Sequence, residues 1–134
     1  GALAGLVAIT ADPLSPSPLV ATMIGAVGGL IVVASIVMFD KIRIDDPVGA
    51  ISVHGVVGIW GVLAVLFTNG DATAVGQIVG VVSIFARAFG VSFIVWYLLK
   101  LVIGIRVSEE EEYEGVDISE CGLEAYPQFT SASE

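Results

Sequence analysis

One residue could do acid–base chemistry inside an apolar segment: His54, the only histidine among 134 residues. Residues 48–58, which surround it, read VGAISVHGVVG. An imidazole donates and accepts hydrogen bonds and changes charge near neutral pH. Among aliphatic neighbours in a membrane, such a ring must face protein or a water-filled cavity. His54 is therefore the leading candidate for a functional residue.

Small residues flank His54 at helical spacing. Ala50 and Gly58 lie one turn before and after it, and Gly61 continues the stripe, which leaves room beside the imidazole. Two explanations remain open from the residues alone. Either His54 is structural and bonds a neighbouring helix, or it lines a narrow conduit and shares protons with what passes.

The composition indicates a membrane protein, because 56% of the residues are hydrophobic, only 14% are charged, and the mean hydropathy is +0.95. Three apolar stretches, 19–39, 48–67 and 78–103, reach the roughly 20 residues that a membrane-spanning helix needs. Residues 1–11 are apolar but about half that length, so we interpret them as the end of a helix and the chain as a C-terminal part. We predict an all-α membrane protein whose transmembrane portion covers residues 1–106.

Two helix starts carry capping signals. Ser17 precedes Pro18, and Asp46 precedes Pro47; in each pair the first residue suits the N-cap and the proline suits the first helical position. For Asp45 and Asp46 we favour this structural role, since carboxylates are stabilised at helix N-termini. A direct part in substrate chemistry is the weaker alternative.

Basic residues predict the orientation. Lys41 and Arg43 follow the first full span, Lys100 and Arg106 follow the last, and the other two loops contain no base. By the positive-inside rule, the 40–46 loop and the C-terminal tail are cytoplasmic. The prediction is a multi-pass protein of the cell membrane with a cytoplasmic tail.

The tail, residues 107–134, differs from the rest in charge. It holds nine of the fourteen acids and none of the five bases, so the net charge of −9 resides there. By composition a run of four glutamates is a solvated face. The nine acids are Glu109, Glu110, Glu111, Glu112, Glu114, Asp117, Glu120, Glu124 and Glu134.

Enzymatic, metal and nucleic-acid functions find little support in the residues. The spans offer no cysteine, carboxylate or second histidine near His54, and Cys121 is the only cysteine. The exposed part is acidic, and no glycine loop of the phosphate-binding kind occurs. We expect no enzyme, no cofactor, no bound metal and no nucleic-acid partner.

Several segments together resemble the C-terminal third of the ammonium transporter (Amt/Mep/Rh) family. They are GALAGLV at 1–7, DDP at 45–47 followed by VHGVVGI at 53–59, GIRVSEEEE at 104–112, EGVD at 114–117 and AY at 125–126. The resemblance implies an eleven-helix channel-like subunit in a homotrimer. Residues 1–11 would then end the eighth helix, and the three spans would be the ninth to eleventh.

The resemblance also implies roles for residues of the spans. His54 matches the second of two pore histidines and would take a hydrogen bond or proton from ammonium stripped of water, because a bare ion is costly in a pore of low dielectric. Ala50 matches a pore-lining apolar position and is smaller than the usual side chain. The other pore walls belong to the remaining helices of the subunit, which meets the lipid bilayer outside.

In the tail, Arg106, Gly115, Asp117, Gly122, Ala125 and Tyr126 match the family pattern, which implies a regulatory tail that docks under the neighbouring subunit. A PII-type nitrogen-signalling protein binds nearby in the family. The function predicted is the C-terminal part of an ammonium/ammonia channel-transporter. The alternative is an ammonium sensor or regulatory membrane fragment that signals through its tail.

Overall fold

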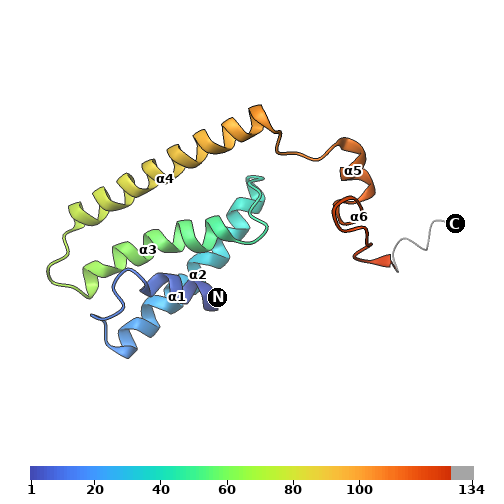
Figure 1. Cartoon of the computed structure of the whole chain (residues 1–134). Coiled ribbons are helices and arrows are strands. Elements are labelled where there is room, and N and C mark those ends of the chain that lie inside the picture. The colour runs from blue at the N-terminus through green and yellow to red at the C-terminus, as the bar shows by residue number, and fades with distance from the viewer. Residues whose placement is uncertain (128–134) are drawn as a thin grey trace. The chain divides into compact units, whose positions relative to one another are not determined.

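A computed structural model describes residues 1–127, and every regular element in that range is a helix (Figure 1). Residues 128–134, with Glu134 of the predicted acidic tail, lie outside the described residues. The chain divides into two compact units, one from Gly1 to Ala88 and one from Phe89 onward. The elements are α1 (Ala2–Ile9), α2 (Pro18–Lys41), η1 (Ile51–Val56), α3 (Val57–Ala64), η2 (Val65–Phe67), α4 (Ala74–Val102), α5 (Glu109–Glu114) and α6 (Val116–Cys121).

The first two helices follow the sequence closely. Within the apolar residues 1–11, α1 covers Ala2–Ile9, and the stretch 19–39 forms α2 with one more residue at its start and two at its end. Pro18 occupies the first turn of α2, and the Ser17 hydroxyl accepts a hydrogen bond from the Val20 N–H at 3.4 Å. The predicted Ser17–Pro18 start is confirmed.

The stretch 48–67 differs from the single regular helix that the sequence suggested. It becomes a helical run, Ile51–Phe67, made of the π-helix η1, the α-helix α3 and the 3₁₀ turn η2. Pro47 is not its first residue, because a turn closed by the Gly49 N–H and the Asp46 carbonyl, 2.9 Å apart, comes first. Gly49 has a φ of +70°, a conformation that glycine adopts without a Cβ clash.

The core of the first unit is formed where α1 packs against α2 and α3 (Figure 1). Its backbones approach closely: a Cβ on Gly25 would lie 3.5 Å from the Gly5 Cα, and a Cβ on Gly28 would lie 2.9 Å from the Ala8 Cβ. Small residues permit such approach where no hydrophobic effect acts between helices. Gly29, which fits a four-residue spacing from Gly25, meets nothing within 4 Å, and Gly28 makes the contact instead.

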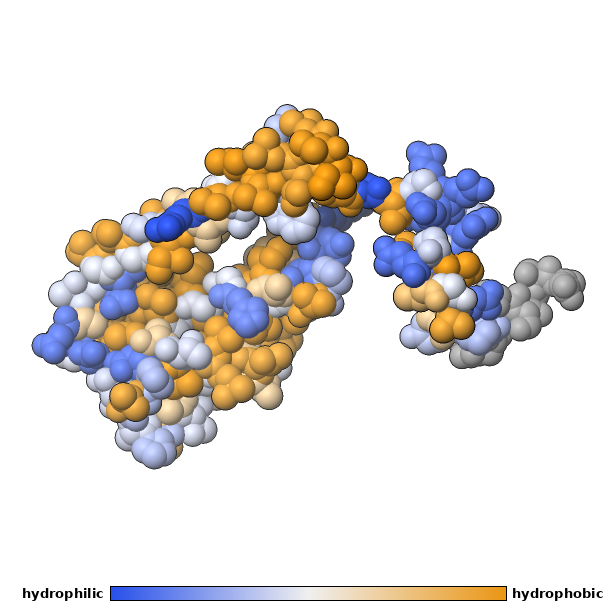
Figure 2. All heavy atoms as spheres, in the orientation of Figure 1, coloured by the Kyte–Doolittle hydropathy of each residue, from blue (hydrophilic) through white to orange (hydrophobic). Residues whose placement is uncertain are grey.

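Helix α4 is the longest element and begins at Ala74, four residues before the stretch 78–103 that the sequence indicated. None of its 29 residues is buried within the chain, and its surface is mostly hydrophobic (Figure 2). Phe89, Phe93 and Tyr97 form a ladder along it, with successive ring centroids 6.1 Å apart. Among the described residues, α2 and α4 are the helices long and apolar enough to cross a membrane, and Ile51–Phe67 is a shorter apolar helix.

Candidate functional site

His54 is the fourth of six residues in the π-helix η1. Within the chain its side chain is exposed, as is that of Ala50, whereas Ser52 and Val57 are fully buried. The buried side of this run packs on α1 and α2. His54 and Ala50 therefore lie outside the face of this run that α1 and α2 cover. π-Helical turns are rare and occur often at functional sites.

Asp46 holds the start of the helix that carries His54. Its two carboxylate oxygens accept hydrogen bonds from the N–H groups of Ile51 and Ser52, each at 2.9 Å. Partial desolvation works to raise the pKa of Asp46, but these backbone hydrogen bonds outweigh it and lower the pKa below its ordinary value. Asp46 thus binds the first N–H groups of η1 from four residues before Ala50, the residue at the N-cap position, and Asp45 beside it is exposed.

Residues that follow His54 in the chain fix α3 against α1 and α2. The Trp60 indole N–H donates to the Ile24 carbonyl of α2 at 3.1 Å. A Cβ on Gly61 would lie 2.8 Å from the Ala8 carbonyl oxygen, so the backbones of α3 and α1 are in direct contact. The sequence had marked Gly61 as part of a small-residue stripe, but nothing in it singled out Trp60 as a link between helices.

The tail residues fall into a small folded segment. Ser108 and Glu111 form a capping box at the start of α5, and the Arg106 guanidinium lies 2.7 Å from the Glu112 carboxylate. The N–H and hydroxyl of Ser108 lower the pKa of Glu111. The pattern Ser-x-x-Glu at 108–111 is the sequence signal for such a box.

Beyond α5 the chain turns at Gly115, where φ is +110°, and α6 ends at Gly122 in the left-handed conformation. The Asp117 carboxylate accepts a hydrogen bond from the Ala125 N–H at 2.6 Å, which ties the residues after α6 back to its first turn. Four predicted tail residues, Arg106, Gly115, Asp117 and Gly122, thus shape this segment. The Tyr126 side chain is exposed. Hydrophilic side chains dominate α5, whereas α6 mixes hydrophilic and hydrophobic ones (Figure 2).

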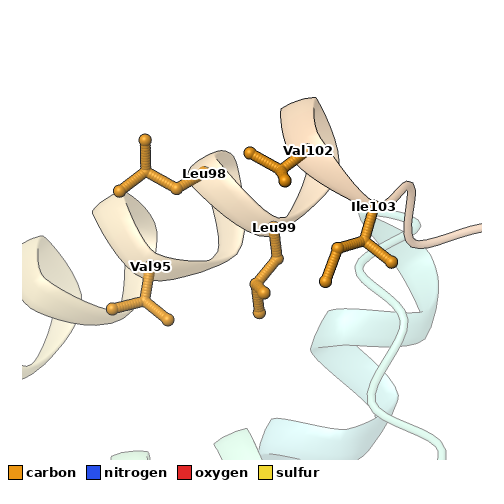
Figure 3. A pocket seen from close by; sticks show the side chains of 5 residues that line it. All are labelled: Val95, Leu98, Leu99, Val102 and Ile103. Carbon is orange, nitrogen blue, oxygen red and sulfur yellow. The ribbon is translucent and has the colours of Figure 1, made fainter.

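One hollow in the described part of the chain offers no binding chemistry for an ion. A hollow near the C-terminal end of α4 is lined only by aliphatic side chains (Figure 3), those of Val95, Leu98, Leu99, Val102 and Ile103. It supplies no side-chain donor or acceptor. Among residues 1–127, no group of three or more His, Cys, Asp or Glu side chains is placed to hold a metal ion.

The model of the Ammonium Transporter Family matches residues 1–126. The chain belongs to this family. Ammonium transporter Amt2 of Archaeoglobus fulgidus is 40% identical over 149 residues, which cover 96% of this chain and 32% of that protein. Ammonium transporter Amt1 of Haloferax mediterranei is 39% identical, covering 99% of this chain and 27% of that protein. The family resemblance inferred from the sequence is confirmed.

A putative ammonium transporter of Synechocystis is 42% identical, covering 91% of this chain and 28% of that protein. The chain thus spans about a third of the length of the curated relatives it matches. These members of the ammonium transporter family are named as transporters and not as enzymes. No solved structure matches the chain significantly.

Proposed function

We propose that this chain supplies one wall of an ammonium-conducting pore, with His54 facing the conduit and Ala50 beside it. One observation carries the proposal: His54 is exposed on a helix whose other side is buried against α1 and α2. An imidazole facing lipid would be costly, so this face must meet protein or a water-filled path. In a member of the ammonium transporter family, that path is the pore completed by the remaining helices of the subunit.

His54 would act on the substrate by proton and hydrogen-bond exchange. An ammonium ion that sheds water in a narrow apolar pore loses most of its solvation, and a neutral imidazole nitrogen offsets part of that cost by accepting a hydrogen bond or a proton. Ala50 and Gly58, without bulky side chains, leave the space that such a path requires. The protein is then a transporter of ammonium or ammonia and not an enzyme.

The assembly and the tail complete the proposal. The transporter would be a homotrimer in the cell membrane with its C-terminal tail in the cytoplasm, where the segment from Arg106 to Tyr126 regulates transport. The hydrogen bond between Asp117 and Ala125 and the capping box at Ser108 support a tail with a defined shape. Such a segment offers a surface to a neighbouring subunit or to a PII-type nitrogen-signalling protein.

The test is methylammonium uptake by the transporter that contains this chain, in transport-deficient cells, over a range of pH. The variants are His54→Ala and His54→Glu, with Ile59→Ala, an exposed aliphatic position on the same helical run, as the matched control. A changed flux, ion selectivity or pH dependence in the His54 variants alone, at equal amounts in the membrane, supports the pore. Absence of flux in the wild type favours the alternative, an ammonium sensor that signals through its tail.

A further inference from the structure

We propose that Asp46 is a positioning residue for His54: its carboxylate holds the π-helical turn η1, and that turn sets the face of the helix on which the imidazole stands. This inference rests on the proposed pore role of His54. Asp46 does not itself meet the substrate in this proposal, since both carboxylate oxygens are engaged by backbone N–H groups.

The N-terminal end of η1 is fixed from Asp46 by three hydrogen bonds. The carboxylate accepts from the N–H groups of Ile51 and Ser52, and the Asp46 carbonyl accepts from the Gly49 N–H, each at 2.9 Å. The first N–H groups of a helix have no partner within the helix, so a carboxylate that binds two of them selects where the helix begins. Val53 then donates to the Gly49 carbonyl at 2.8 Å, which starts the run.

The C-terminal end of η1 is fixed by packing. Val57 is fully buried, Trp60 is bonded to the Ile24 carbonyl of α2, and Gly61 lies against the backbone of Ala8 in α1. Rotation of α3 about its axis would break these contacts together. The helix is therefore held at both ends, with His54 in between.

Between these two anchors, η1 contains a residue more than a regular helix would. A π-turn closes hydrogen bonds from i to i+5, whereas an α-turn closes them from i to i+4. Without the Asp46 carboxylate, the segment is free to become α-helical. Since α3 cannot rotate, the residues before Val57 must shift along the helix instead. A shift by one residue turns a side chain by up to about 100° about the helix axis. His54 would then leave its present face.

Three variants of the transporter containing this chain test the inference in proteoliposomes. Asp46→Ala removes the acceptor, Asp46→Asn retains one acceptor oxygen in the same shape, and Asp45→Asn removes a charge at the neighbouring exposed position. Loss of a helix cap of ordinary strength corresponds to about a fivefold change in an equilibrium. We expect Asp46→Ala to lower the maximal methylammonium flux per folded molecule by up to about fivefold with little change in KM. Asp46→Asn should recover part of the flux, and Asp45→Asn should match the wild type.

Electron cryo-microscopy of Asp46→Ala supplies a readout independent of transport, namely the face on which His54 stands. A turned imidazole with α-helical hydrogen bonds over 51–56 supports the inference, and an unmoved imidazole or wild-type flux overturns it. If the wild type carries no methylammonium, the proposed function fails, while the position of His54 still decides the role of Asp46. If Asp46→Ala does not fold, Asp46→Asn takes its place, and an unmoved ring with unchanged flux again overturns the inference.

Discussion

Gly61 provides the sharpest test of how the helices of the first unit are held together. In Gly61→Ala, the new Cβ would lie 2.8 Å from the Ala8 carbonyl oxygen and 3.2 Å from the Val7 carbonyl oxygen. Both are backbone atoms, so no side-chain rotation relieves the clash, and α3 must move away from α1. Overpacking of this kind costs about 1–3 kcal/mol, and the better helix propensity of alanine returns about 1 kcal/mol. The expected net loss is up to about 2 kcal/mol.

Gly58→Ala is the matched control, because it makes the same change in the same helix. Its Cβ would lie 4.0 Å from the nearest Val7 atom, which is an ordinary contact. This variant should keep or gain stability, by up to about 1 kcal/mol. Thermal unfolding of the purified transporter in detergent compares the two midpoints. Equal stability of Gly61→Ala and Gly58→Ala would refute the argument that α1 and α3 pack backbone against backbone.

Three further predictions concern other contacts. Trp60→Phe should lower the free energy of unfolding by about 1 kcal/mol, because the hydrogen bond from the indole N–H to the Ile24 carbonyl is lost, and the same thermal assay measures it. Ser108→Ala should raise the pKa of Glu111 only part of the way toward 4.5, because it removes the hydroxyl donor but keeps the backbone N–H of residue 108; carboxyl NMR measures this. Because that pKa is lowered in the folded tail, the stabilisation of α5 is present above the unfolded pKa and is lost as the pH falls through the folded pKa. In Ser108→Ala this loss should be smaller but still present. Gly122→Ala should speed amide exchange in α6, since a non-glycine residue in the left-handed conformation costs about 1–2 kcal/mol.

The long helices could be predicted from the sequence because their signals are local. Apolar length alone outlined α2, and the Ser17–Pro18 pair marked its start within one residue. The family could be recognised because several short motifs occur in one order, although each is weak alone. His54 could be singled out because it is the only histidine and lies in an aliphatic segment.

The π-helix could not be predicted, because it depends on contacts made by the residues before it and by the residues after it. Asp46 and Pro47 have the residue types of a regular N-cap and first turn, and only the turn at Gly49 displaces the helix start. The packing of Gly28 in place of Gly29 has a similar origin. Gly28 and Gly29 are both small residues of α2. Which of them packs against α1 depends on the position of Ala8, which belongs to α1.

The position of Ala8 bears on how this part of the protein is made. A single alanine of α1 touches Gly28 of α2 and Gly61 of α3, so no pair of these helices completes the packing around it. During synthesis α1 and α2 emerge before α3, so the backbone of Ala8 that meets Gly61 stays uncovered until α3 has been made. The packing around Ala8 can therefore close only once α3 lies beside α1 and α2.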